Sequence, residues 1–344
     1  MKIILFFLLL IVVLAAAVVG YVFLGPGTAF GENKKSLYIS SQAATKRAVL
    51  DSLEKNKMLK NDKAFEWLAN RLDYWKSIKP GKYDLIKGNS LLTILRKLRN
   101  GQQTPVNLVI TKLRTKEDFA RLTASHFEFD STQMMDFLSS PDSLQPFSTD
   151  PVTVMSLILP DTYTFFWNTT PRKVLKKLAD ESQKFWTVER KKKAEEHGLN
   201  PVEAYTLASI VEEETNATAE KGNIASVYIN RIEKGMPLQA DPTIKFAAKD
   251  FTLTRIYGPY LNVESPYNTY RNKGLPPGPI CTPSKTTIEA VINSPKTDYL
   301  YFVADSSFNG THLFSSSLEE HAKKAKAYQE AFKRRFSSNE NAEQ

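Results

Sequence analysis

An unbroken apolar run from Ile3 to Leu24 constrains the fold of this chain more than any other segment. The run contains no charged residue, and as a helix it is long enough to cross the hydrocarbon core of a bilayer. Because the apolar core of a signal peptide is shorter, the run predicts a retained single-pass membrane helix. The alternative is a signal peptide that is cleaved after the alanines at Ala15 to Ala17.

The flanking charges leave the orientation of this helix open, because Lys2 precedes it while Lys34 and Lys35 follow it. A single N-terminal span before a large soluble region most simply leaves that region outside the cytoplasm. We therefore expect a cell-membrane protein whose soluble part faces the periplasm or the outer side. The only cysteine, Cys281, excludes an intramolecular disulfide and neither requires nor forbids this location.

The composition is that of an ordinary globular protein with a basic surface. The chain has 344 residues, 42% of them hydrophobic and 24% charged, which allows about two domains. The net charge of +9, with a cluster at Arg190 to Lys193, favours an anionic lipid or an anionic wall polymer as partner. Nucleic acid is the rival partner, but no zinc finger or RNA-binding aromatic motif supports it.

The soluble part reads as α+β, with short strands and helices alternating in its first region. We expect four parts: an anchor and linker (1–35), an N-terminal α+β region (36–150), a second domain (151–336) and a flexible tail (337–344). In the first region the predicted strands are Ser36–Ser40, Lys82–Ile86 and Val106–Ile110, and the predicted helices are Thr45–Leu59, Asp62–Leu72 and a helix from Leu91, capped by Ser90 and closed by Gly101.

The second domain is preceded by a polar, broken stretch, Phe127–Asp150, that we expect to connect the two regions. Its predicted elements are a long basic helix (Val174–Lys193), a helix at Thr218–Lys234, an irregular loop (Met236–Pro283), paired strands (Tyr299–Asp305 and His312–Phe314) and a last helix from the Ser317 capping box to about Phe336. A loop of some forty ordered residues usually serves a binding site.

One helix, Asn200 to Asn216, carries the clearest chemical signal. Asn200 is a natural N-cap and Glu203 completes a capping box. Apolar residues then recur at three- and four-residue steps (Ala204, Leu207, Ile210 and Val211), and Glu214 is the next position on that face. Its neighbours Glu212 and Glu213 are expected to be solvent carboxylates on other faces.

A carboxyl group at the end of a buried face suits a general acid. Burial disfavours the charged form and raises the pKa of a carboxyl group toward neutrality, so Glu214 could donate a proton near pH 7. The alternative is that the apolar face simply ends and Glu214 reaches water. Position alone does not decide between them.

Other catalytic chemistries lack their motifs. The four histidines are widely separated, and no HExxH or cysteine pair is present, so we expect no metal site. No G-x-S-x-G elbow, Walker A or GxGxxG motif occurs, so we expect neither a serine hydrolase nor a nucleotide cofactor. What remains is a carboxylate and a loop rich in aromatic rings and amides, which suit sugar rings.

These residues resemble the membrane-anchored endolytic murein transglycosylases, also called the MltG-like or YceG-like family. The resemblance spans nearly the whole chain in the same order. It includes KPGKY at Lys79, LPDTY at Leu159, ASIVEEET at Ala208, INR at Ile229, GMPLQADPT at Gly235, SPYNTY at Ser265, GLPPGPI at Gly274, KTDYLYFVAD at Lys296, and His312 with Phe314. Two details depart from the family: Ser306–Asn309 replaces a Gly-rich turn, and Ala322 follows His321 where Asn is common.

The resemblance implies a fold and a set of site residues. It implies a lysozyme-like catalytic domain and a LysM-like module near Lys79–Ile110. It places the catalytic glutamate on Glu214. It implies that the substrate-binding residues are Glu212, Gln239, Asp241, Asn268, Thr269 and Tyr270.

The resemblance also implies an activity: cleavage of the MurNAc–GlcNAc bond inside nascent peptidoglycan strands, with 1,6-anhydro-MurNAc ends and without metal or cofactor. The implied partners are the glycan strands, the membrane and, as a further option, peptidoglycan synthases. Two rivals stay open at this point. One is a muramidase that uses water and needs a second carboxylate, for which Asp241 is the only motif candidate. The other is a non-catalytic wall-binding protein.

Overall fold

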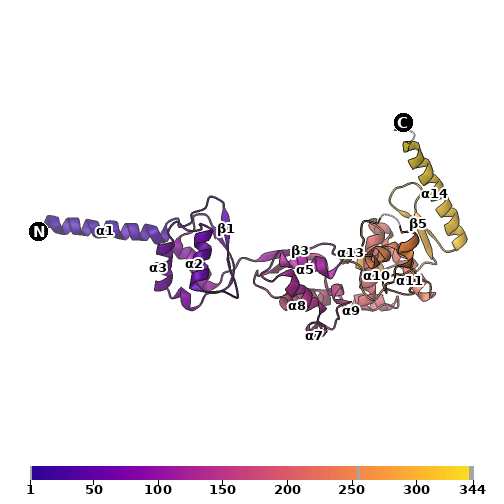
Figure 1. Ribbon diagram of the computed structural model, residues 1–344, viewed down its shortest axis with the longest axis horizontal. Coiled ribbons are helices and arrows are strands. Elements are labelled where there is room, and N and C mark those ends of the chain that lie inside the picture. Colours follow the sequence, from indigo (N-terminus) through magenta and orange to yellow (C-terminus); the bar gives the residue numbers. More distant parts are fainter. Residues whose placement is uncertain (1, 254–255, 341–344) are drawn as a thin grey trace. The chain divides into compact units, whose positions relative to one another are not determined.

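The computed structural model describes residues 2–253 and 256–340 and shows a mixed helix-and-sheet protein (Figure 1). The chain divides into two compact units. Unit 1 contains the residues up to Leu108 together with 123–130 and 163–170, and unit 2 contains 109–122, 131–162 and the chain from Pro171 onward. The expectation of mixed helix and sheet with an apolar N-terminal helix is confirmed.

The apolar run forms helix α1 (Lys2–Leu24). It is the one helix in the described part of the chain that is long and apolar enough to cross a membrane, and its side chains are exposed rather than buried in the protein. A signal sequence near the N-terminus would have the same properties, so this observation alone does not separate an anchor from a cleaved leader.

The segment after α1, which the sequence predicted to be a linker, is hydrogen-bonded to the rest of unit 1. The amide of Gly27 donates to the carbonyl of Asn89 at 2.9 Å, and its carbonyl accepts from the amide of Lys60 at 2.8 Å. Thr28 forms an antiparallel bridge with Leu59. Because these bonds begin within three residues of the end of α1, the helix is joined to unit 1 by a short, ordered connection.

Unit 1 is a small α+β body around one hydrophobic core. Its strands β1 (Lys34–Ile39) and β2 (Gly81–Ile86) pair antiparallel, and its helices are α2 (Lys46–Lys55), α3 (Asp62–Arg71), η1 (Tyr74–Lys76) and α4 (Leu91–Asn100). Ser90 caps α4 by accepting from the amide of Thr93 at 3.2 Å, and Gly101 ends it with a φ of +68°. Both helix boundaries were predicted, because capping signals are local.

The polar stretch expected to connect the regions is largely helical. Strand β3 (Val106–Ile110) pairs with β4 (Asp161–Phe165), and between them lie α5 (Lys116–Ala124), α6 (Ser131–Ser139), α7 (Pro141–Leu144), η2 (Gln145–Phe147) and η3 (Val154–Leu157). Met134, Leu138 and Leu144 are fully buried. The segment therefore contributes to a core and is not a simple connection.

The long basic helix predicted at Val174–Lys193 is two helices, so that prediction was wrong. Helix α8 (Pro171–Phe185) ends before Trp186, and α9 (Val188–Glu195) begins after Thr187. The Thr187 hydroxyl accepts from the amide of Arg190 at 3.3 Å, which caps α9. Basic residues recur from α8 into α9, which is why one helix was predicted. The helix is nevertheless interrupted between them, where Thr187 caps α9 and Trp186 is buried.

The remainder of unit 2 surrounds one central helix. Its elements are α10 (Pro201–Glu214), η4 (Thr218–Glu220), α11 (Lys221–Glu233), α12 (Asp241–Ala247), η5 (Gly258–Asn262), α13 (Lys285–Ile292), β5 (Tyr301–Ala304), β6 (His312–Ser315) and α14 (Leu318–Glu340). The predicted loop 236–283 thus contains a helix, α12. Helix α13 was not predicted.

The predicted C-terminal hairpin is confirmed, but the expected tail is shorter. Strands β5 and β6 pair antiparallel, with Phe302 opposite Phe314. Helix α14 continues to Glu340, past the predicted end near Phe336, and the rest of the predicted tail, 341–344, lies outside the described residues. Ser317 accepts from the amide of Glu320 at 3.2 Å, as an N-cap residue does.

Candidate active site

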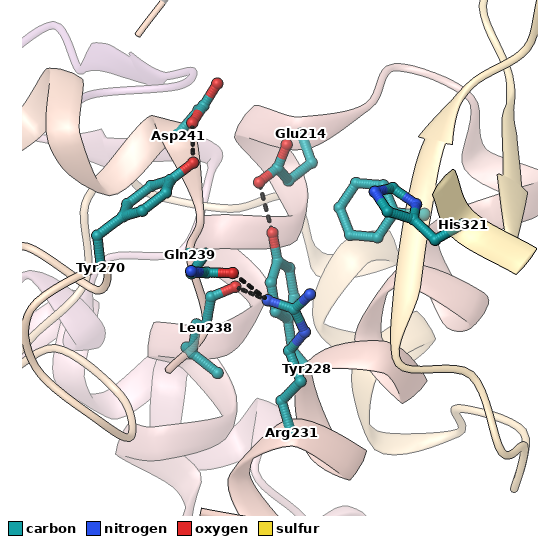
Figure 2. Close-up of a pocket in the computed structure, with 9 residues that line it drawn as sticks. Glu214, Tyr228, Arg231, Leu238, Gln239, Asp241, Tyr270 and His321 are labelled. Carbon is teal, nitrogen blue, oxygen red and sulfur yellow. Dashed lines mark hydrogen bonds between the residues drawn. The ribbon is translucent and has the colours of Figure 1, made fainter. Parts of the chain in front are cut away.

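A polar pocket of about 270 Å³ lies in unit 2 where the C-terminus of α10 meets the loop after α11 (Figure 2). Figure 2 shows Glu214 between the Asp241–Tyr270 pair on one side and His321 on the other. The lining residues are Glu214, Tyr228, Arg231, Leu238, Gln239, Asp241, Tyr270, Phe302 and His321. Four of the seven residues proposed from the sequence line the pocket: Glu214, Gln239, Asp241 and Tyr270.

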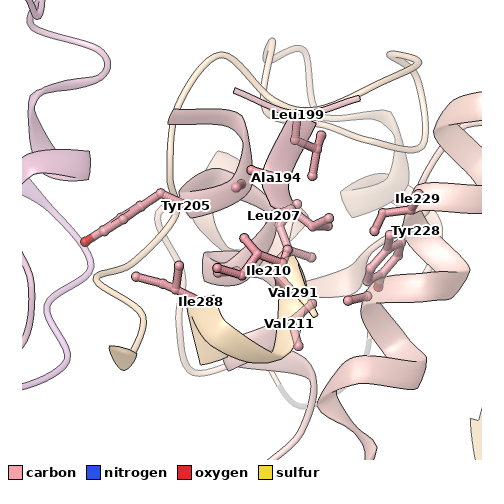
Figure 3. Close-up of a cluster of buried hydrophobic side chains, with 14 of the residues drawn as sticks. Ala194, Leu199, Tyr205, Leu207, Ile210, Val211, Tyr228, Ile229, Ile288 and Val291 are labelled. Atoms are coloured by element: carbon pink, nitrogen blue, oxygen red, sulfur yellow. The ribbon is translucent and has the colours of Figure 1, made fainter. Parts of the chain in front are cut away.

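The middle of the helix that carries Glu214 is buried, and its apolar side chains pack with residues of α11 and α13 (Figure 3). Every residue from Ala204 to Val211 is at most 2% exposed, so the prediction of a single apolar face was too narrow. Asn200 and Glu203 form the predicted capping box. Eight consecutive buried residues fix the helix in a close-packed core, and Glu214 at its C-terminus is positioned by that core.

One oxygen of Glu214 is fixed by the protein and the other is available. The Tyr228 hydroxyl donates to Oε1 at 2.5 Å, and no described residue hydrogen-bonds Oε2. The side chain is partly exposed, at the pocket wall. Glu214 is therefore positioned by one contact and can present its second oxygen to a bound molecule.

The pKa of Glu214 is raised to about 7. Burial is the largest cause, because it penalises the carboxylate form, and the charge of Asp241 acts in the same direction. The hydrogen bond from Tyr228 and the charge of Lys245 act against it. The neutral acid therefore persists up to about neutral pH, which is what proton donation requires.

Arg231 joins the pocket wall to the strand beside it. Its Nε donates to the carbonyl of Leu300 at 2.7 Å, and its Nη1 donates to the carbonyl of Leu238 at 2.7 Å. The guanidinium also lies over the ring of Tyr301, 5.2 Å from its centre. Arg231 is 8% exposed, so these contacts are shielded from water. Lying three residues after Tyr228 on α11, it faces the same pocket.

Gln239 has a strained backbone at the mouth of the pocket. Its φ of +53° is rare for a residue with a side chain. The turn is held by Thr269, whose carbonyl accepts from the amide of Gln239 at 3.1 Å and whose Oγ1 accepts from the amide of Ala240 at 3.0 Å. Strain of this kind persists only where surrounding contacts fix it, and here it turns Gln239 toward the pocket.

Asn268 and Thr269 support the loop and do not line the pocket. Both are at most 1% exposed. The Asn268 amide nitrogen donates to the carbonyls of Leu261 and Val263 at 3.0 and 2.9 Å, while Thr269 holds the 239–240 turn. Asn268 and Thr269 therefore hold the loop that carries Gln239 and Tyr270, and their own side chains are buried behind it.

Asp241 is engaged by a neighbour. The Tyr270 hydroxyl donates to its Oδ1 at 2.6 Å, and the carboxylate raises the pKa of Tyr270 further than burial does alone. This pair lies across the pocket from His321 (Figure 2). Asp241 therefore acts on Glu214 as a nearby negative charge.

Glu212 and Glu213 are not solvent carboxylates, so that expectation was wrong. Their side chains are 16% and 14% exposed. Glu212 accepts from Lys221 Nζ at 2.8 Å and from the hydroxyls of Ser284 and Thr287, and neither glutamate lines the pocket. Local spacing could not show this, because Ser284 and Thr287 lie more than seventy residues away in the chain.

Five pocket residues were not proposed from the sequence: Tyr228, Arg231, Leu238, Phe302 and His321. Arg231 ends the INR motif and Tyr228 directly precedes it. Their three-residue spacing on one helix could have shown that both side chains lie on the same face. His321 stacks on Tyr301 at 5.2 Å, and burial lowers its pKa, which keeps the ring neutral near pH 7. The sequence had marked His321 only as the family position that precedes Ala322, and no local spacing connected it with Glu214.

Comparison with known proteins identifies the family. The sequence pattern of the YceG-like family matches residues 37–327, a range that contains every residue of the pocket. The chain belongs to the YceG-like family.

Curated YceG-like relatives include proteins named endolytic murein transglycosylase. The one from Bacillus subtilis (strain 168) is 31% identical over 299 residues, which cover 82% of this chain and 81% of the relative. The one from Streptococcus pneumoniae (strain D39) is 29% identical over 306 residues, covering 78% of this chain but 54% of the relative. This chain therefore spans about half of the pneumococcal protein.

A solved structure of a YceG-like protein has the same fold. The crystal structure of the protein from Listeria monocytogenes matches with a TM-score of 0.56 and 26% identity, and the match covers 85% of this chain and 99% of that one. The family assignment therefore rests on both sequence and fold.

Proposed function

We propose that this YceG-like protein is a lytic transglycosylase that cuts peptidoglycan glycan strands. The observation that carries the proposal is Glu214: a carboxyl group with a pKa of about 7, fixed by Tyr228 and facing a polar pocket. The names of the Bacillus and Streptococcus relatives supply the substrate, murein.

In the proposed reaction Glu214 acts twice. As an acid, its Oε2 gives a proton to the oxygen of the MurNAc–GlcNAc bond, and the C1–O bond breaks. As a base, the carboxylate then takes the proton from the C6 hydroxyl of the same MurNAc while O6 bonds to C1. The products are a free GlcNAc 4-hydroxyl and a 1,6-anhydro-MurNAc end. No water is consumed, and Glu214 regains its proton.

The intramolecular route fits a site with one available carboxyl group. A hydrolase needs a second carboxylate to activate water or to attack the sugar, and Asp241 is hydrogen-bonded to Tyr270. The C6 hydroxyl is tethered to the ring that it attacks, so its effective concentration is high without any captured water. Gln239, Asp241 and Tyr270 would contact the sugar, with Asn268 and Thr269 supporting their loop from behind. Glu212 would support the end of α10 through Lys221 and Thr287.

We further propose the architecture and location that the sequence suggested. Residues 36–150 would form the N-terminal region with a LysM-like module, and residues 151–336 the lysozyme-like catalytic domain. Helix α1 would stay in the cell membrane as a single-pass anchor, with the catalytic domain extracytoplasmic. Cuts inside nascent strands would limit their elongation, and peptidoglycan synthases are the partners we propose for that step.

The products of cleavage test the mechanism directly. We expect 1,6-anhydro-MurNAc ends, lighter by one water than hydrolytic ends, when purified glycan strands are digested and analysed by mass spectrometry. We expect activity to persist in EDTA, since no group of three His, Cys, Asp or Glu within 2–253 and 256–340 could hold a metal. Reducing MurNAc ends that carry ¹⁸O from labelled water would instead identify a hydrolase.

The pH dependence of the rate should report the protonation of Glu214. Because the neutral acid starts the reaction, kcat/KM should fall as pH rises through about 7, the pKa of Glu214. The groups that shift the pKa of this carboxyl are Tyr228, Asp241, Lys245 and Glu213. Conservative substitutions of Tyr228 and of Asp241 should move that pKa in opposite directions.

Tyr228→Phe removes a hydrogen bond that favours the carboxylate, so the alkaline limb should move to higher pH. Asp241→Asn removes a negative charge that disfavours it, so the limb should move to lower pH. Initial rates measured across the pH range give both midpoints, whatever the maximal rates. If both variants keep the midpoint of the unmodified enzyme, the limb belongs to another group.

A further inference from the structure

The end of α1 is packed against unit 1, and the packing fixes which surface lies beside it. The Phe23 side chain packs on the unit 1 core and stacks on Trp67 of α3, with 5.2 Å between ring centres. The connection that follows is bonded to Asn89 and Lys60. These contacts tie the end of α1 to the rest of unit 1.

The position of Phe23 along α1 sets the depth of Trp67. The apolar run from Ile3 to Leu24 has 22 residues, which as a helix span about 33 Å, close to the roughly 30 Å of a bilayer's hydrocarbon core. Phe23 is its penultimate residue, so in a membrane it lies where hydrocarbon meets headgroups. A ring stacked on Phe23 must lie at the same depth.

The face of α3 around Trp67 has the composition of an interfacial surface. Lys63, Trp67 and Arg71 follow one another at four-residue steps and share one face of the helix. Trp67 is 52% exposed, and the Arg71 guanidinium lies 5.8 Å from its ring centre. No described carboxylate forms an ion pair with Lys63 or Arg71. Tryptophan and arginine or lysine are the residues enriched at membrane interfaces.

We propose that Lys63, Trp67 and Arg71 form a headgroup contact surface that seats unit 1 on an anionic membrane. The inference rests on the proposed anchor and deepens it: α1 would not be a loose tether, and unit 1 would be held at a fixed height by α1 and α3 together. Trp67 would lie among the headgroups, with the two cations on either side of it contacting lipid phosphates.

Fluorescence quenching by brominated lipid tests the contact. The full chain is reconstituted into vesicles of phosphatidylcholine and phosphatidylglycerol, with bromine placed either near the headgroups or near the chain ends. We expect bromine near the headgroups to quench more strongly, and we expect this excess to be lost in Trp67→Phe. The other tryptophans, Trp75, Trp167 and Trp186, are unchanged in both proteins. Equal quenching with and without Trp67 would overturn the inference.

The charges are tested in the same vesicles. Lys63→Gln with Arg71→Gln should reduce the shallow quenching of Trp67 when phosphatidylglycerol is present and change little in phosphatidylcholine alone. Arg47→Gln with Lys55→Gln, two exposed cations of α2, removes the same net charge elsewhere and should leave the quenching unchanged. An equal effect of the two pairs would show that only net charge matters, which would contradict a contact surface on α3. Circular dichroism confirms the fold of each variant.

The anchor itself has a separate readout. An alkaline carbonate wash of membranes followed by N-terminal sequencing shows whether the chain is retained intact. Release of a shortened chain that begins after the alanines at Ala15 to Ala17 would overturn the anchor and this inference with it. Retention of the intact chain without quenching that depends on Trp67 would overturn the α3 contact alone.

Discussion

Glu214→Gln should abolish glycan cleavage and leave the fold intact. Glutamine keeps the size of the side chain and still accepts the Tyr228 hydrogen bond, but it can neither donate the proton to the leaving oxygen nor take one from the C6 hydroxyl. Loss of a general acid costs about 10²–10⁴ in rate, and more when the same group serves both steps. Release of 1,6-anhydro ends from purified strands measures it.

The same variant should gain stability at alkaline pH. The pKa of Glu214 is about 7 in the folded protein against 4.5 ordinarily. The folded state thus holds the proton longer than the unfolded chain does. The wild-type protein therefore loses stability as pH rises from about 4.5 to about 7, by at most about 3 kcal/mol.

Glutamine cannot ionise, so the stability of Glu214→Gln should equal or exceed that of the wild type above pH 7. Below pH 4.5, where the carboxyl is protonated in both states, the two should converge. Urea titrations at several pH values measure the difference. A Gln variant that cleaves at a near-normal rate would remove Glu214 from the proposed mechanism, whatever its stability.

Glu212→Gln should have the opposite profile, a large loss of stability with little change in the rate per folded molecule. Glu212 neutralises Lys221, whose side chain is 8% exposed and whose Nζ lies 2.8 Å from Glu212 Oε2. Removing one member of a buried ion pair leaves the other charge unpaired and costs about 3–5 kcal/mol. Thermal melting should show a decrease of about 10 °C for a unit of this size.

A double variant separates the lost pair from a general packing defect. Glu212→Gln with Lys221→Met removes both charges, and we expect it to recover most of the lost stability, as buried pairs replaced by apolar groups commonly do. A double variant as unstable as Glu212→Gln alone would show that the hydroxyls of Ser284 and Thr287, and not the ion pair, account for the loss.

The pH dependence of stability distinguishes the two glutamates. Burial pushes the pKa of Glu212 upward, but the hydrogen bonds from Lys221 and Thr287 and the charge of Lys221 outweigh it, so the pKa is lowered overall. Its contribution is therefore present above about pH 4.5 and is lost as pH falls through the lowered folded pKa. Glu214 destabilises the folded state at alkaline pH, whereas Glu212 stabilises it there.

The sequence by itself determined the features that depend on near neighbours. The capping box of α10, the caps of α4 and the pairing of β5 with β6 were all predicted, because each is specified by residues a few positions apart or by short alternating strands. The same spacing predicted that Glu214 lies at the end of a buried face. Length and apolarity alone predicted α1.

Only the tertiary structure decided how the three glutamates of α10 differ. Helical spacing reports which residues share a face, but not what packs against that face, and α10 is buried on every face from Ala204 to Val211. The partners of Glu212 come from the start of α11 and from α13 with its N-cap, a helix that was not predicted, and the partner of Glu214 comes from the middle of α11. The pKa of a carboxyl group is set by such partners and by the exclusion of water. For this reason a carboxyl group with a raised pKa, Glu214, can follow directly after two ion-paired carboxylates, Glu212 and Glu213, in one EEE sequence.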